Sequence, residues 1–327
     1  MAVSRRRFIT ISAGLLAAGV VSPPALLAAP HVARWRGVAM GADAELKLAH
    51  PDQNKTRRAI KSVESEIRRL EKVFSLFDPT SALSQLNKVG FIDLPPLDLI
   101  RCLDDAVQIS DVTGGAFDYT VQPLWDLYSR HFAKYPDDEI GPDKMDIKSA
   151  LERIDYKSVE FSSRRIQFMK PGMKITLNGI AQGYLTDRVT ELLKSRGFDN
   201  ILVDLGEIRG LGKPGNGHDW QVGIKAADGS TGLIKKVPLK NKAIATSGGY
   251  GTRFNKTGTF NHLFDPQTGQ SPEMWSSISV IADDATRADA LSTAFYSLPA
   301  TAIENRARHL NVSVIAHRGF ENDLINF

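Results

Sequence analysis

Asn178-Gly-Ile-Ala-Gln-Gly-Tyr184 joins a short apolar segment at 174–177, predicted to be a strand, to a helix predicted over 180–195. Three of these seven residues are Gly or Ala, so the backbone of the turn can approach a ligand closely. The first N–H groups of the helix that follows can bind a phosphate, because they have no partner within the helix. The segment is also compatible with an ordinary helix start that Asn178 caps.

Short segments on both sides of this turn define the fold class. From residue 157 onward, apolar and polar residues often alternate, which is typical of half-buried strands. The predicted strands are 159–161, 166–169, 174–177, 201–205, 220–225, 243–246, 275–282 and 311–316. A second helix in this half is predicted over 285–297. The mixture predicts an α+β fold, a single composite domain of mixed or antiparallel sheets with packed helices over 30–327.

The preceding part of the mature chain is predicted to be mainly helical. Apolar residues recur at three- and four-residue steps over 53–77, which indicates an amphipathic helix that an Asp-Pro pair then ends. A further helix is predicted over 96–114, with proline in its first turn and glycine at its end. Residues 136–146 are rich in Pro, Gly and Asp and are predicted to form a surface loop.

Composition excludes several classes of protein. Hydrophobic residues make up 42% and charged residues 24%, so the chain can bury a full core and is not disordered. The single cysteine, Cys102, excludes a disulfide framework and a cysteine-based zinc site. The net charge of +4 comes mostly from Arg5, Arg6 and Arg7, so it gives no reason to expect nucleic-acid binding.

The same arginines begin a predicted export signal. They precede Phe8 and an uncharged stretch that extends to Pro30, as in a twin-arginine signal peptide. We therefore expect a signal at 1–29 and a periplasmic domain at 30–327. The alternative is a signal that is retained as a membrane anchor, although the apolar segment is short for a span.

Generic nucleotide and hydrolase motifs are incomplete. Gly210-Leu-Gly-Lys-Pro-Gly215 matches GxGxxG, but no helix is predicted at its third glycine, so we interpret it as a turn. Gly212-Lys213-Pro214 lacks the hydroxyl of a P-loop. Ala245-Thr-Ser-Gly-Gly249 is similar to half of a nucleophile elbow, with His262 downstream as a base, and this leaves a serine hydrolase as an alternative.

Two other segments carry groups suited to phosphate chemistry. Asp289 and Thr293 are four residues apart on the predicted 285–297 helix, so they share one face, and Ser292 adjoins them. A carboxylate with hydroxyl oxygens suits a hard ion such as Mg²⁺, although Asp289 can also simply favour the helix dipole. His262 precedes an Asp-Pro…Gly turn and is either a proton acceptor near neutral pH or a structural histidine.

Eight sequence blocks are in register with one known family. They are Met40-Gly41, Phe74-Ser-Leu-Phe77-Asp-Pro79, Gly114-Gly-Ala116-Phe117-Asp118, Asn178–Tyr184, Leu202-Val-Asp204-Leu-Gly206, Thr246-Ser247-Gly248, His262…Gly269 and Ala288-Asp289-Ala-Leu-Ser292-Thr293. In this order, over about residues 35–315, the chain resembles the ApbE-type FAD:protein FMN transferases. The resemblance implies an ApbE-like fold and Mg²⁺-dependent transfer of FMN from FAD to a threonine hydroxyl of an acceptor flavoprotein, with release of AMP.

The resemblance also implies roles for individual positions. It implies flavin contacts for Met40, Phe77, Ala116, Phe117, Asp118, Asn178, Tyr184, His262 and Leu263. It implies Mg²⁺ ligation by the carbonyl of Ala181 and by Asp289 and Thr293, with Ser292 in the metal site. His262 matches the histidine that assists catalysis in the family.

Some positions depart from the common family pattern. Thr176, Asn178 and Gln182 stand where the pattern has an acid, a glycine and a lysine, and Glu207 stands where many members have a second glycine. The variant is similar to an exported branch associated with nitrous-oxide respiration. Gln182 and Thr176 leave open a periplasmic flavin-binding or maturation factor without catalysis. An FAD pyrophosphatase that releases free FMN and AMP is a third possibility.

Overall fold

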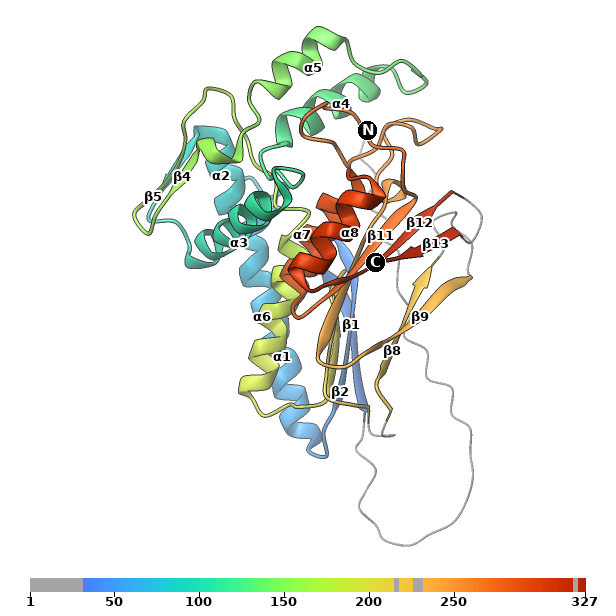
Figure 1. Ribbon diagram of the computed structural model, residues 1–327. Helices are drawn as coiled ribbons and strands as arrows, with labels where there is room; N and C mark the ends of the chain where they lie inside the picture. The colour runs from blue at the N-terminus through green and yellow to red at the C-terminus, as the bar shows by residue number, and fades with distance from the viewer. Residues whose placement is uncertain (1–31, 215–217, 226–231, 320–322) are drawn as a thin grey trace, which may run out of the picture.

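A long antiparallel sheet forms the centre of the molecule (Figure 1). The computed structural model describes residues 32–214, 218–225, 232–319 and 323–327, so the signal predicted at 1–29 lies outside the described residues. Within these residues the sheet has the order β1-β2-β6-β7-β10-β11-β12-β13, and neighbouring strands are antiparallel throughout. Its strands are β1 Val32–Ala39, β2 Ala42–Ala49, β6 Ile201–Asp204, β7 Ile208–Leu211, β10 Lys242–Ser247, β11 Ser277–Ala282, β12 Ser313–Arg318 and β13 Asp323–Asn326.

The sheet is covered differently on its two faces. Helices cover one face: α1 Gln53–Phe74, α6 Ala181–Ser195, α7 Ala285–Tyr296 and α8 Ala300–Leu310 (Figure 1). Helix α3 Leu97–Thr113 packs on α1 and α7. The hairpin of β8 Trp220–Lys225 and β9 Leu233–Leu239 packs its apolar side chains on Ile208 and Ile244 of the other face. Because each layer buries an apolar side against the sheet, the α+β fold predicted from the sequence is confirmed.

Two smaller parts extend this core. One is a three-stranded sheet, β3 Phe91–Asp93, β5 Arg165–Phe168 and β4 Val159–Phe161, beside α2 Ala82–Val89. The other is a helix pair, α4 Gln122–Lys134 and α5 Lys144–Leu151, which packs through an aromatic cluster on the 254–264 loop. Helix α5 occupies the end of the segment 136–146 that was predicted as loop, because Asp143 caps it by accepting from the Met145 N–H. No helix among the described residues is long and apolar enough to cross a membrane.

The first helix is shorter than its periodicity predicts. Helix α1 ends at Phe74, not at residue 77, because Ser75 is extended and its Oγ accepts hydrogen bonds from the N–H groups of Phe77 and Asp78. This side-chain turn competes with the helical hydrogen bonds. As a result, Phe77 leaves the helix and becomes exposed.

The prediction of a strand at 174–177 is wrong. The side chain of Asn87 bonds both the N–H and the carbonyl of Ile175, at 2.8 Å each, and the Thr176 N–H donates to the Tyr119 carbonyl. These partners replace a strand ladder, because backbone groups need hydrogen bonds but not necessarily those of a sheet. The segment therefore enters α6 without belonging to any sheet.

Candidate functional site

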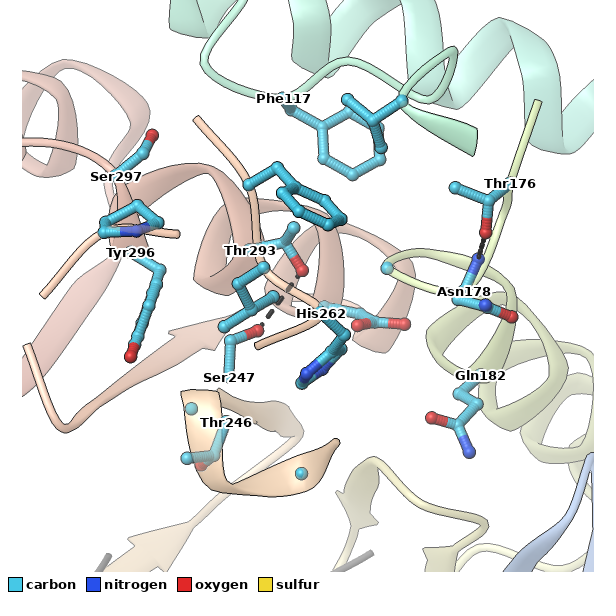
Figure 2. Close-up of a pocket in the computed structure, with 18 of the residues that line it drawn as sticks. Phe117, Thr176, Asn178, Gln182, Thr246, Ser247, His262, Thr293, Tyr296 and Ser297 are labelled. Carbon is cyan, nitrogen blue, oxygen red and sulfur yellow. Dashed lines mark hydrogen bonds between the residues drawn. The ribbon is translucent and has the colours of Figure 1, made fainter. Parts of the chain in front are cut away.

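One pocket lies where the N-terminus of α6, helix α7 and the end of β10 meet. The 116–121 loop and the 248–266 loop close it from the sides (Figure 2). Eight of the residues predicted for the site line it: Ala116, Phe117, Asp118, Asn178, His262, Leu263, Asp289 and Thr293. The fold thus brings together segments that are up to 177 positions apart in the chain.

The other predicted residues lie around the pocket, not in its wall. Ala181 is the first residue of α6, and Ser292 is buried behind Thr293 on α7. Tyr184 lines a separate hollow on the other side of α6. Its hydroxyl donates to Asp98 at 2.9 Å. Met40 has a left-handed backbone, with φ of 49°, and its N–H donates to Glu71.

Phe77 belongs to a second, outer hollow that adjoins the pocket. Its side chain is 73% exposed, and the hollow also contains Trp125 and Asn178, which are shared with the pocket. An exposed aromatic side chain beside an opening can stack on a planar ring. The two hollows together suit a ligand with a polar part and an aromatic part.

Close backbone approach at the α6 turn explains its small residues. A Cβ at Gly179 would lie 2.9 Å from Thr293 Oγ1, and a Cβ at Gly183 would lie 2.2 Å from the carbonyl oxygen of Ala285. Glycine at these positions therefore lets the start of α6 pack directly on α7. The Gly183 N–H donates to Asp289 Oδ2 at 3.0 Å, which fixes that carboxylate at the helix N-terminus.

Hydroxyl groups from two elements meet beside Asp289. Ser247 Oγ, at the end of β10, lies 2.7 Å from Ser292 Oγ. It also lies 3.2 Å from Thr293 Oγ1, a contact that is dashed in Figure 2. These contacts orient Thr293 toward the pocket. Only the 3-10 turn Gly249–Gly251 follows β10, whereas a nucleophile elbow needs a helix there, so the arrangement does not favour a serine hydrolase.

The acids of this pocket are poorly compensated. Burial raises the pKa of the Asp289 carboxyl to about 7, although the Gly183 N–H favours its charged form. Burial, and then the negative charge of Asp289, raise the pKa of Glu207 well above its ordinary value. Carboxylate, hydroxyl and carbonyl oxygens are the donors that Mg²⁺ accepts, so Asp289, Thr293 and Ala181 fit such an ion.

Glu207 and Gln182 also line the pocket, and the sequence indicated them only as departures from a pattern. Gln182 Nε2 and Glu207 Oε2 are buried and have no hydrogen-bond partner within the part of the chain that the structure describes. An unsatisfied buried polar atom costs about 1–3 kcal/mol. Such a cost at a pocket wall is consistent with a ligand that completes the contacts.

His262 approaches the same pocket from the 252–264 loop. Its Nδ1 lies 3.2 Å from the Thr252 carbonyl oxygen, and its backbone N–H donates to that same oxygen at 3.0 Å. Because a carbonyl can only accept, we assign the ring proton to Nδ1, which leaves a lone pair on Nε2. Packing of the ring against Gly251, where a Cβ would lie 3.1 Å from Cε1, restricts its position further.

Asp118 contributes to the shape of the pocket through its loop. Its Oδ1 accepts from the N–H and the hydroxyl of Thr120, and its Oδ2 accepts from the Tyr156 N–H. Burial raises the pKa of Asp118 above its ordinary value, although these hydrogen bonds oppose the rise. Its carboxylate is therefore engaged in holding the 116–121 loop.

These features define an α+β protein with a candidate ligand site that combines a helix N-terminus, an oxygen-donor set and an imidazole. The ApbE family model matches residues 40–316, and the chain belongs to the ApbE family.

Curated relatives agree with this assignment. The chain is 30% identical over 263 residues to the FAD:protein FMN transferase of Treponema pallidum, covering 73% of this chain and 71% of the relative. It is 29% identical over 246 residues to the FAD:protein FMN transferase of Haemophilus influenzae, covering 72% and 71%.

Solved structures show the same fold. The apo flavinyl transferase ApbE of Pseudomonas stutzeri superposes with a TM-score of 0.78 at 25% identity, covering 92% of this chain and 96% of that one. The ApbE protein of Thermotoga maritima superposes with a TM-score of 0.77 at 27% identity, covering 88% and 94%.

Proposed function

We propose that this chain is a Mg²⁺-dependent transferase that moves FMN from FAD to a threonine hydroxyl of an acceptor flavoprotein and releases AMP. The observation that carries the proposal is the pocket, in which the N-terminus of α6, the oxygens of Asp289 and Thr293, and the His262 imidazole lie together. Membership of the ApbE family and the names of the relatives support the same activity.

The protein's main contribution is to align and neutralise the phosphates. The positive end of the α6 dipole attracts a phosphate, and Asp289, Thr293, Ser292 and the Ala181 carbonyl would hold Mg²⁺. When bound, Mg²⁺ supplies positive charge against the phosphate oxygens. The bond between the two phosphates breaks as the threonine oxygen bonds to the FMN phosphorus, and AMP leaves. No covalent intermediate with the enzyme is required.

His262 serves as the proton acceptor of this step. Its Nδ1–H is directed to the Thr252 carbonyl, so Nε2 can take the proton of the incoming threonine hydroxyl. The 116–121 loop and the exposed Phe77 position the ring systems of FAD, in line with the flavin contacts predicted for these residues.

A direct assay tests the proposal. The protein is incubated with FAD, Mg²⁺ and an acceptor domain, and flavin fluorescence of the acceptor band is read on a denaturing gel. A fluorescent band, with one AMP released per flavin attached, is expected, and an acceptor with its threonine changed to alanine is the control.

The alternative is a flavin-binding or maturation factor without catalysis. The uncharged Gln182 favours it, because a neutral amide compensates a pyrophosphate less than the family's lysine would. Saturation near one FAD per chain without any transfer would support this alternative. Free FMN and AMP without a labelled acceptor would instead identify a pyrophosphatase, and absence of FAD binding at high micromolar concentration would contradict all three.

We also propose that the chain acts in the periplasm after twin-arginine export, with an acceptor in a periplasmic or membrane-bound redox system. The Arg5-Arg6 pair before Phe8 supports this route. Changing both arginines to lysine keeps the charge and is expected to leave an uncleaved precursor in the cytoplasm. Normal periplasmic yield, measured by fractionation, would indicate the general secretory route.

A further inference from the structure

Glu207 is a buried acid that the mechanism above does not use. It follows the turn after β6, is 6% exposed and lines the pocket. One carboxylate oxygen accepts the Thr246 N–H, while Oε2 is enclosed and without a hydrogen-bond partner among the described residues. A buried carboxylate with an unused oxygen is costly unless a cation or a donor satisfies it.

The charged groups that act on Glu207 are themselves acids. Asp289 has the larger effect and Asp204 the smaller, and both disfavour a negative charge on Glu207. Within the described ranges, neither Glu207 nor Asp289 forms an ion pair with a lysine or arginine. Lys225 lines the same pocket but makes no such pair there. The pocket therefore holds two buried carboxyl groups and lacks a protein cation bound to either.

Gln182 provides a second, independent sign of a missing ligand. It is 5% exposed, and its Nε2 lies so close to the turn before Glu207 that a Cβ at Gly206 would be 2.7 Å away. The donor Nε2 has no acceptor in the described part of the chain. An unpaired donor and an unpaired acceptor thus lie on one side of the pocket, where a cation and its anionic ligand would satisfy both.

We propose that Glu207 supplies a second negative charge to the divalent-cation site of Asp289 and Thr293. This inference rests on the proposed function, because it concerns the same ion. Two carboxylates around a divalent cation are neutral as a set, whereas two carboxylates without it repel each other. Gln182 is then available to donate to an oxygen of the bound phosphate. Glu207 is a positioning residue for the cation, not a catalytic residue.

The test measures metal binding without turnover. Purified protein free of FAD is titrated with Mn²⁺ as the probe, and free Mn²⁺ is followed by electron paramagnetic resonance, with Mg²⁺ as competitor. The variants are Glu207→Gln, Glu207→Asp and Asp289→Asn. Glu152→Gln, an exposed change on the end of α5, is the matched control. Thermal unfolding of each variant is recorded with and without Mn²⁺.

The expected results separate charge from shape. Glu207→Gln should weaken Mn²⁺ binding by tenfold or more, Glu207→Asp by less, and Glu152→Gln should match wild type. The metal-free melting temperature of Glu207→Gln should be unchanged or higher, because the substitution replaces a buried carboxyl group whose ionisation is disfavoured. A purely structural role for the carboxylate predicts a lower melting temperature instead.

Several outcomes would overturn the inference. Wild-type Mn²⁺ affinity in Glu207→Gln, with binding lost in Asp289→Asn, would reject the role of Glu207 and keep the proposed metal site. Equal losses in Glu207→Asp and Glu207→Gln would show that shape matters and charge does not. Absence of Mn²⁺ binding by wild type would reject both this inference and the Mg²⁺ dependence of the proposed function.

Discussion

The two sides of helix α6 each hold a buried aspartate, but only one of them is compensated by the protein. Asp187, on one side, is 7% exposed and accepts from Ala285 N, Thr286 N and Thr286 Oγ1 at 2.9, 2.8 and 2.6 Å, and it pairs with Arg209. Asp289, on the pocket side, is 4% exposed and accepts from the Gly183 N–H.

This difference in hydrogen bonds and ion pairs indicates which aspartate stabilises the fold and which is suited to bind a ligand. Asp187 accepts the first two N–H groups of α7 and neutralises an arginine, so its charge is balanced within the folded chain. The pKa of Asp289 rises to about 7, because burial is not matched by a cation. Similar burial with unequal compensation of the charge distinguishes a structural carboxylate from a site carboxylate.

The largest effect is expected from Asp289→Ala. The variant should keep its fold and lose Mg²⁺-dependent FMN transfer by about a thousandfold, since metal charge stabilisation is worth several kcal/mol. Transfer rates at limiting and at saturating Mg²⁺, beside a circular dichroism spectrum, measure both parts. Wild-type activity at limiting Mg²⁺ would contradict the assignment of Asp289, and an unfolded variant would place it with Asp187 as a structural acid.

His262→Ala should reduce the rate without weakening FAD binding. Proton removal from threonine is needed only as the phosphoester forms, and general-base catalysis typically contributes about a hundred- to ten-thousandfold. Single-turnover transfer measured beside a flavin titration separates rate from affinity. Parallel loss of both would make His262 a ligand-positioning residue, and loss of neither would make it a structural histidine.

Asp187→Ala should lower the stability of the fold and should not act on the chemical step. The substitution removes the carboxylate that pairs with Arg209 and that accepts the Ala285 N–H at the start of α7. Breaking a buried ion pair typically costs about 3–5 kcal/mol. Urea unfolding of this variant and of Asp289→Ala gives the comparison directly. A larger loss of unfolding free energy in Asp289→Ala than in Asp187→Ala would reverse the distinction between the two sides.

The smallest effect is a pH dependence of metal-free stability. The pKa of Asp289 is raised from 3.8 to about 7 in the folded protein. The unfolding free energy that depends on its protonated form is therefore fully present below pH 3.8 and is lost as pH rises through about 7. Asp204, raised to about 7 mainly by burial, acts in the same direction. Unfolding free energy, measured between pH 4 and 8, should therefore fall less steeply in Asp289→Asn or with Mg²⁺. An unchanged slope in both would contradict the prediction.

Local patterns in the sequence determined much of the fold. The helices α6 and α7 and most strands of the second half follow from periodicity and capping, because these depend on neighbours within a few residues. The same spacing places Asp289 and Thr293 on one helix face, and both line the pocket. The predictions were wrong for the end of helix α1 and for a strand at 174–177. In both places a side chain, Ser75 or Asn87, accepts a hydrogen bond from a backbone N–H group.

Only the tertiary structure decided which buried acids are balanced. Pairing of Ile208 with Ile244 brings Glu207 beside Thr246, and α7 then adds Asp289 from 82 positions farther along the chain. Asp187 and Tyr184, although close to Gln182 in sequence, face the other side of α6 toward Arg209 and Asp98. The sequence alone could identify the residue types of the site. Whether the charge of each acid is compensated depends on non-local contacts. Electrostatic energy in a buried site is determined by distance in space, not along the chain.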